Sequence, residues 1–428
     1  MIGVTVTVLL VLLALSIPVA AVLCIVGLTL DQTYSFLPLY LAIGEFSWSV
    51  SNDVILVAVP LYILLGELLL RSGIAERMYA AMMHWLSWLP GGLMHSNVGT
   101  CTLFSAVSGS SVATAATIGT VALGEIKRHG YNERMFIGTI AAGGTLGILI
   151  PPSINMIVYG VLTETSIPQL YLAGMLPGLI LAGLFMLTVI VGCLFRPRWG
   201  GSKIETSWAA RWASLPDLFP PLVIFVVVIG SIYGGLATPT ESAALGVIIA
   251  LGLAAWRRRL SWSMLRDAVE GTMRSTAMIM LILVGAYFLN FVLSSIGLSS
   301  KVTTFVTETG WSPMTTLVAV VLFYLVLGMF METLSMMIAT VPLITPVVVA
   351  LGFDPVWFGV LMMLLIETAL ITPPVGVNLY VVQGVRGRGQ LHDVMLGAAP
   401  FVITLVVMIV LLILYPQLAL LIPEAIGR

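Results

Sequence analysis

Long apolar runs separated by short polar breaks dominate this sequence, and several exceed the roughly 20 residues that cross a lipid bilayer. They predict membrane-spanning helices at 4–30, 53–71, 218–236, 240–256, 275–296 and 394–421. Three further runs are long enough to cross, although some are interrupted: 135–160, 169–195 and 356–384. The pattern therefore predicts an all-α, polytopic membrane protein.

Two segments differ from these runs because polar residues lie at their centres. Segment 98–124 is centred on Ser108-Gly109-Ser110-Ser111, and segment 315–350 bends around Met331-Glu332-Thr333. Unsatisfied backbone groups cost several kcal/mol each in lipid, so such centres must be buried in protein or line a wet cavity. Both segments are predicted to be re-entrant hairpins. Stretches 75–89 and 298–311 are predicted to lie at the membrane surface, and 196–217 is predicted to be a polar linker.

Three sequence marks recur at one spacing of about 223 residues. The pairs are Trp88-Leu89-Pro90 with Trp311-Ser312-Pro313, Pro151-Pro152 with Pro373-Pro374, and Gly174-Met175-Leu176-Pro177 with Gly397-Ala398-Ala399-Pro400. Chance similarity between apolar stretches is the alternative, but it does not explain why all three pairs keep the same spacing. The recurrence predicts two related units around a central transport site.

Loop charges indicate how the two units are related. Basic residues fill the loops 196–211 and 257–274, which are separated by two predicted spans, so both loops are expected in the cytoplasm. In the first unit the loop 127–134 is basic, whereas its counterpart near Asp354 has no Lys or Arg. Further along the two units the charge difference between equivalent loops is reversed, since Thr163-Glu164-Thr165 is acidic and its counterpart Arg386-Gly387-Arg388 is basic. Equivalent loops on opposite sides predict inverted repeats, covering roughly 54–195 and 277–418.

Each unit also carries a helix broken at a proline pair, about 40 residues after its hairpin centre. Proline lacks an N–H and clashes with the preceding turn, so nearby carbonyls lose their helical partners. Free carbonyls beside hydroxyls form a hard oxygen cage of the kind that holds sodium in discontinuous transporter helices. The alternative is that the prolines only kink the helix and the serines only allow close packing. The presence of both features in both units favours the cage.

Composition narrows the functional class. Hydrophobic residues make up 59% and charged residues 9% of the chain, and the net charge of −1 gives no indication of a nucleic-acid partner. No Lys or Arg lies within 98–126, 135–195 or 313–385. A buried carboxylate substrate would therefore need bound cations and helix N-termini for neutralisation. The spans contain no catalytic triad or metal-ligand pattern, so an enzyme is not expected.

Four acidic residues in or near the spans divide into two kinds. Glu332 and Glu367 lie at the second hairpin and second break, where a costly intramembrane carboxylate favours a functional role. Glu241 follows Thr238 at a helix start, which favours a cap. Glu67 precedes Arg71 by four residues, which favours an ion pair along one helix.

Four motifs together resemble the large membrane subunit of tripartite ATP-independent periplasmic transporters, and the likeness covers essentially the whole chain. They are Ser105 to Thr114, Gly147 to Ser153, Ala237 to Glu241 and Gly328 to Glu332. The resemblance implies a multi-pass, elevator-type carrier of a bacterial or archaeal inner membrane, driven by two or more sodium ions. It also implies an organic-acid substrate, a soluble periplasmic substrate-binding protein and a separate small four-helix membrane subunit.

Carried over by position, the resemblance implies two sodium sites and a substrate site. The first sodium site would comprise Ser108, Gly109, Ser110, Ser111, Gly144, Gly147 and Ser153. The second would comprise Glu332, Thr333, Thr368, Thr372 and Pro373. Substrate-binding residues of the broken helices would be Pro151, Pro152, Asn155, Glu367, Pro374 and Asn378. Two residues depart from the family pattern: Ser111, where glycine is frequent, and Glu332, where aspartate is common.

The predicted organisation has five parts. These are an N-terminal helix with an interfacial segment (1–52), a first inverted repeat (53–195), a cytoplasmic linker with central scaffold helices (196–274), a second inverted repeat (275–421) and a tail (422–428). The predicted function is sodium-coupled uptake of a small carboxylate delivered by a binding protein. The alternative is a stand-alone sodium/proton antiporter or sodium/dicarboxylate carrier of similar fold.

Overall fold

The computed structural model contains helices and no strand in the part of the chain it describes, which is residues 1–428 except 16, 203, 205, 299, 300, 302, 303, 305–309, 427 and 428. The first helices are α1 (Ile2–Ala14), α2 (Val19–Tyr34), α3 (Ile43–Asn52), α4 (Ala58–Arg71), α5 (Ile74–Leu86), α6 (Leu93–Ser108), α7 (Ser111–His129), α8 (Glu133–Thr145), α9 (Ile154–Thr163) and α10 (Ile167–Phe195). They are followed by α11 (Trp208–Tyr233), α12 (Pro239–Trp256), α13 (Trp262–Ser295), α15 (Pro313–Gly328), α16 (Thr333–Ala350), α17 (Pro355–Ile371), α18 (Val377–Arg386), α19 (Leu391–Leu414) and α20 (Gln417–Ile426).

The all-α fold class predicted from the sequence is confirmed. Among the described residues, six helices are long and apolar enough to cross a membrane alone, and the pair α4 and α5, bent by 69°, would form a seventh span. The two predicted hairpins coincide with the helix pairs α6–α7 and α15–α16, and each predicted broken helix is divided at its proline pair.

Prolines divide two of the predicted spans that the sequence presented as continuous. The predicted helix 4–30 is two helices, with Pro18 at the N-cap of α2, and the predicted helix 394–421 ends at Leu414, before Pro416. Both predictions were wrong because a hydropathy pattern does not show that proline lacks the N–H needed for a helical hydrogen bond. The linker predicted at 196–217 is shorter than expected, since α11 begins at Trp208, and the tail predicted at 422–428 is helical as far as Ile426. The surface stretch predicted at 298–311 lies largely outside the described residues.

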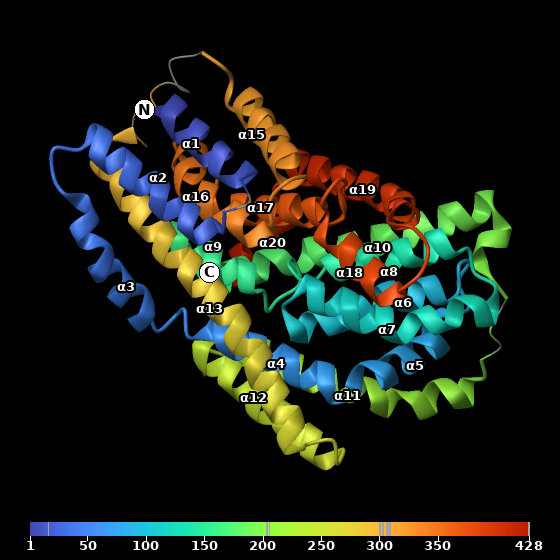
Figure 1. Cartoon of the computed structure of the whole chain (residues 1–428). Coiled ribbons are helices and arrows are strands. Elements are labelled where there is room, and N and C mark those ends of the chain that lie inside the picture. The colour runs from blue at the N-terminus through green and yellow to red at the C-terminus, as the bar shows by residue number, and fades with distance from the viewer. Residues whose placement is uncertain are drawn as a thin grey trace.

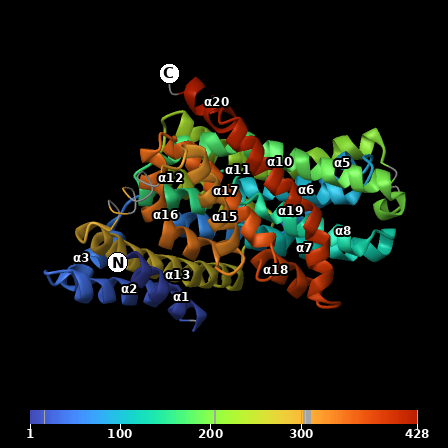
Figure 2. The same ribbon diagram turned by 90° about the horizontal axis from the view of Figure 1, so that it is seen from above.

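One group of helices packs around the long helix α13. Helices α2, α3 and α4 lie along it, and α11 and α12 pack against one another and against α5 and α4, respectively (Figures 1 and 2). The crossing of α2 and α13 is close at small residues, because a Cβ on Gly285 would lie 2.9 Å from the carbonyl oxygen of Ala20. We call α2, α3, α4, α5, α11, α12 and α13 the scaffold group.

The second group contains both hairpins, both broken helices, and α10, α19 and α20. Helices α8 and α19 cross with backbone against backbone, since a Cβ on Gly138 would overlap the carbonyl oxygen of Gly397 and a Cβ on Gly397 would overlap that of Arg134. An ion-pair network joins them at one end. Arg386 of α18 binds Glu133 at 3.0 Å, and Arg134 binds Asp393 at 2.9 Å. We call this set the hairpin group.

Loops of like charge meet within the hairpin group. The basic end of α18 contacts the start of α8 through Arg386 and Glu133. The loops at 163–165 and 354, which lack basic residues, also lie near one another. Here the hydroxyl of Tyr159 in α9 donates a hydrogen bond of 2.9 Å to the carbonyl of Pro355. Inverted repeats would bring the two basic loops to one side in this way, and the inverted relation of the repeats stays a prediction.

We expect Gly138→Ala to destabilise the protein by about 1 to 3 kcal/mol, because the added methyl group must push α8 away from α19. The midpoint of thermal unfolding of the purified protein measures the effect. Gly124→Ala is the matched control, since a Cβ on Gly124 in α7 has no atom within 4 Å. An equal midpoint for both variants would contradict the close crossing.

Candidate functional site

The first hairpin turns at a short polar tip. Helix α6 ends at Ser108, Gly109 adopts a left-handed conformation with a φ of 62°, and α7 begins at Ser111. The hydroxyl of Ser110 accepts a hydrogen bond from the N–H of Ala113 at 3.4 Å, which caps α7. We call residues 108–111 the first tip.

The first broken helix stops at Thr145 and resumes at Ile154. Ser153 is the N-cap of α9 and accepts a hydrogen bond from the N–H of Met156 at 3.4 Å. Between them, Pro151 and Pro152 cannot donate backbone hydrogen bonds, so carbonyls of this stretch lack helical partners. We call residues 146–153 the first break.

The first tip is seated directly on the first break. A Cβ on Gly109 would lie 2.8 Å from the carbonyl oxygen of Pro152, and a Cβ on Gly147 would lie 2.8 Å from the carbonyl carbon of Ser110. The hydroxyl of Ser111 donates a hydrogen bond of 3.1 Å to the carbonyl of Thr145. Of the residues predicted for the first sodium site, the structure brings Ser108, Gly109, Ser110 and Ser111 of the tip against Gly147 and the residue before Ser153, whereas Gly144 packs against Ala115 of α7.

The second hairpin turns at Glu332, which caps α16. Its carboxylate accepts hydrogen bonds from the N–H of Leu334 at 3.1 Å and of Ser335 at 2.9 Å. It also accepts from the hydroxyls of Thr333 and Ser335. A carboxylate at this position opposes the positive end of the helix dipole. The structure therefore gives Glu332 a clear structural role that the sequence did not predict. We call residues 329–333 the second tip.

The second tip meets the second break through backbone groups. The N–H of Val375 donates a hydrogen bond of 3.3 Å to the carbonyl of Met329. The hydroxyls of Thr368 and Thr372 are bonded to carbonyls of their own helix, at Leu364 and Thr368. Within the described part of the chain, no hydrogen bond joins Glu332 or Thr333 to Thr368, Thr372 or Pro373, so the second predicted sodium site is less closely assembled than the first.

Both tips open onto one cavity of about 370 Å³ between the two helix groups. Its lining includes the first tip, Glu332 and Thr333 of the second tip, Asn155 of α9, and residues of α4 and α13. Its polar side chains offer oxygen atoms from Glu67, Glu332, Ser275 and the tip hydroxyls, and no Lys or Arg occurs among its described lining residues. The sequence did not predict Ser275 or the exposure of Glu67 to this cavity, because α4 and α13 reach it only through tertiary packing.

The predicted substrate residues are distributed unevenly around this cavity. Asn155 lines it, whereas Glu367 is completely buried and lies against the backbone of Leu149 without a hydrogen bond of normal geometry. Asn378 is also buried and donates a hydrogen bond of 3.3 Å to the carbonyl of Ala141. Pro374 is exposed. In this conformation, Glu367 lies beside the first break and is not among the residues that line the cavity.

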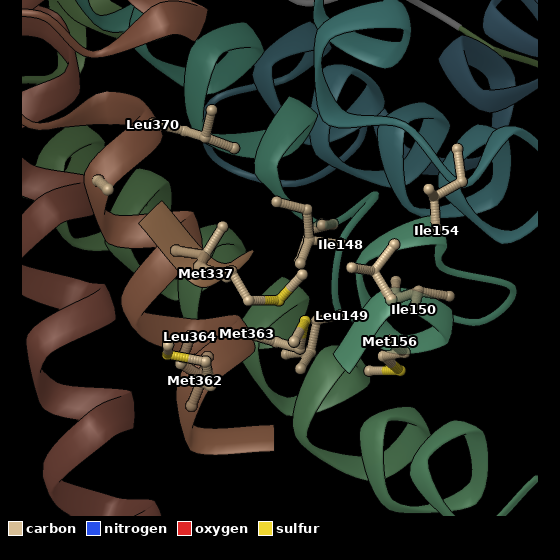
Figure 3. Close-up of a cluster of buried hydrophobic side chains, with 14 of the residues drawn as sticks. Ile148, Leu149, Ile150, Ile154, Met156, Met337, Met362, Met363, Leu364 and Leu370 are labelled. Atoms are coloured by element: carbon tan, nitrogen blue, oxygen red, sulfur yellow. The ribbon is translucent and has the colours of Figure 1, made fainter. Parts of the chain in front are cut away.

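An apolar cluster seals the contact between the two broken helices. Figure 3 shows Ile148, Leu149 and Ile150 of the first break gathered with Met337 of α16 and Met363 of α17. All five side chains are buried. The first break is therefore held against α16 and α17 by close apolar packing, and Ile148 also reaches the cavity.

Two local predictions for acidic residues are confirmed. Thr238 and Glu241 form a reciprocal capping box at the start of α12. Glu67 and Arg71 form a hydrogen-bonded ion pair along α4. Both arrangements depend only on residues three or four positions apart, which the sequence alone can reveal.

Comparison with known proteins assigns the chain to a family. Residues 6–418 match the family described as tripartite ATP-independent periplasmic transporter, DctM component. The chain belongs to this family. It is therefore a multi-pass protein of the bacterial inner membrane and one component of a three-part secondary transporter. The matched family and its relatives are permeases, which supports the prediction that the chain is not an enzyme.

Individual relatives cover most of the chain. The C4-dicarboxylate large permease protein DctM of Pseudomonas aeruginosa is 33% identical over 88% of both chains. The sialic acid large permease protein SiaM of Vibrio cholerae is 32% identical over 86% of both chains. Among solved structures, the YdaH transporter of Alcanivorax borkumensis has the same fold, with a TM-score of 0.67 and 17% identity over 93% of this chain and 97% of that one.

We expect Gly147→Ala to impair transport, because its methyl group would displace the first tip from the first break. Uptake by the reconstituted transporter should fall at least about tenfold, which corresponds to about 1.4 kcal/mol of lost tip packing. Gly252→Ala in α12 is the control, since its Cβ would meet no atom within 4 Å. Wild-type uptake by the Gly147→Ala variant would show that the seated tip is not needed for transport.

Proposed function

We propose that this chain carries a small organic acid across the inner membrane together with sodium ions, after a periplasmic substrate-binding protein has delivered it. The observation that carries the proposal is the single cavity reached by both tips. It presents carbonyls, hydroxyls and carboxylates and has no basic side chain among its described lining residues.

The charge of the cavity argues for cation coupling. An organic anion bound there would face Glu332 and Glu67, and Arg71, which is not among the described lining residues, already pairs with Glu67. Burying an unpaired charge is very unfavourable. The N-termini of α7 and α9 supply partial positive charge at the first tip and at Asn155. Bound cations supply the remainder, so substrate and sodium are expected to bind together.

The residues at the first tip suit sodium better than a transition metal. Among the described residues, no group of three His, Cys, Asp or Glu side chains could hold a metal ion. Sodium instead accepts carbonyl and hydroxyl oxygens, as at the unwound helices of other secondary transporters. Ser108, Ser110 and the carbonyls around Gly144 and Gly147 would hold the first ion. Thr333, Thr368, Thr372 and the carbonyls before Pro373 would hold the second after a local rearrangement.

The two helix groups suggest how access alternates. In the hairpin group, the tips, the breaks and the glycine crossing of α8 with α19 are joined by tight contacts. The scaffold group meets this set along α4, α5, α11 and α13, and the cavity lies at α4 and α13. We propose that the hairpin group moves as one body against the scaffold group, which is elevator-type transport.

The names of relatives indicate the class of substrate and partner. They include permeases for C4-dicarboxylates, sialic acid and ectoine. One relative, the isethionate permease DctMQ, is longer, and the matched region spans 59% of it. We propose that this chain also takes a small organic acid and works with a small membrane subunit.

Reconstitution tests the proposal as a whole. Proteoliposomes that contain this chain and the small membrane subunit should accumulate a radiolabelled organic acid only when an inward sodium gradient and the binding protein are both present. A panel of a C4-dicarboxylate, sialic acid and ectoine covers the chemistry of the relatives. Uptake without the binding protein would favour the stand-alone carrier, and uptake driven equally by potassium would exclude sodium coupling.

Removal of the tip hydroxyls should weaken sodium binding. For Ser108→Ala and Ser110→Ala we expect the sodium concentration for half-maximal uptake to rise about tenfold, because one oxygen contact is worth about 1.4 kcal/mol. Glu332→Gln should reduce uptake while the protein still assembles. Ser214→Ala is the control, because this buried hydroxyl bonds the carbonyl of Arg211 in α11, outside the cavity. An unchanged sodium response in all three cavity variants would show that the sodium sites lie elsewhere.

A further inference from the structure

A second, much smaller pocket lies in the scaffold group beside the basic loop 257–259, which is expected on the cytoplasmic side. It has a volume of about 50 Å³, which is room for one tetrahedral oxyanion and not for a larger substrate. It forms where the corner between α4 and α5 meets α11 and the end of α12. Three arginines line it: Arg77, Arg257 and Arg259.

The arginines outnumber the carboxylates that could neutralise them. Asp217 is the one carboxylate among the described residues that line the pocket. It lies 3.5 Å from a guanidinium nitrogen of Arg77 and 3.7 Å from one of Arg257. Both distances exceed the ordinary length of a charge-assisted hydrogen bond, so donors of both arginines remain available.

Arg259, the third arginine, lines the pocket. Among the described residues, no acidic side chain lies within salt-bridge distance of it. A Cβ on Gly73 would lie 3.9 Å from Nε of Arg259 and 3.8 Å from a carboxylate oxygen of Glu76, so Glu76 borders the same corner. Even if Glu76 is counted with Asp217, three positive charges face two negative ones. The pocket therefore keeps a net positive charge.

The surroundings place this pocket at the membrane surface. The loop that carries Arg257 and Arg259 is basic, as expected of the cytoplasmic side. The guanidinium of Arg257 lies 5.6 Å from the ring centroid of the adjacent Trp256, and this tryptophan is 76% exposed. Exposed tryptophans beside arginines are typical of the headgroup region of a bilayer.

We propose that this pocket binds the phosphate of an anionic membrane lipid, such as phosphatidylglycerol or cardiolipin. The guanidinium fork of arginine matches phosphate oxygens, and basic pockets between helices on the cytoplasmic side bind such headgroups. The acyl chains would lie along the exposed apolar surface beside Trp256. A lipid held there would brace the corner between α4 and α5, and so the scaffold group against which the hairpin group packs.

Native mass spectrometry of the purified complex, with the small membrane subunit present, tests this proposal. After exchange into phosphatidylethanolamine with a small fraction of cardiolipin, the wild-type protein should retain cardiolipin. The double variant Arg257→Gln/Arg259→Gln should bind it about 25-fold more weakly, at about fivefold for each arginine. The control is Arg266→Gln/Arg274→Gln, which removes the same charge from exposed positions on α13. Equal retention by wild type and the pocket variant, or equal loss in both double variants, would overturn the proposal.

A second variant and a competitor complete the test. Asp217→Asn removes the competing carboxylate and should strengthen cardiolipin binding, so weaker binding would contradict the proposal even if the double variant failed to fold. Inorganic phosphate and glycerol phosphate, which lack acyl chains, should not displace cardiolipin at millimolar concentration. Displacement by either would show that the pocket binds a free anion and not a lipid.

Discussion

The structure depends on one constraint, which is that a helix broken inside a membrane must have its freed backbone groups covered by protein or water. The first tip covers the first break so closely that Gly109 and Gly147 have no space for a side chain. The second tip covers the second break through the hydrogen bond from Val375 to Met329. Seated in this way, the tips leave polar groups facing a single cavity, where an ion and an organic acid could meet.

The same constraint explains why the hairpin group is packed so tightly. A tip that moved away from its break would expose unpaired carbonyls to lipid, so tip and break must move together. The glycine crossing of α8 with α19 and the ion pairs of Arg386 and Arg134 join the two repeats in the same body. The proposed movement would take place at the boundary with α4, α5, α11 and α13, and the cavity lies at α4 and α13.

Local features of this molecule were predictable from the sequence, and features that depend on distant packing were not. The proline pairs, the capping box at Thr238 and the pair of Glu67 with Arg71 rely on neighbours within four residues. The break before Pro18 was missed because the apolar run continues through it. The contribution of Ser275 to the cavity and the burial of Glu367 were not predictable, since they arise when α13 and the first break fold against other helices.

The proposed transport cycle requires the hairpin group to move as one body against the scaffold group. Distances between spin labels measure this most directly, after the three native cysteines have been replaced. One pair joins exposed positions 120 and 349, both in the hairpin group, and the other joins positions 120 and 248, across the boundary. With sodium and substrate added or removed, we predict one constant distance for the first pair and a change between two distances for the second. A first pair that varies as much as the second would contradict the account.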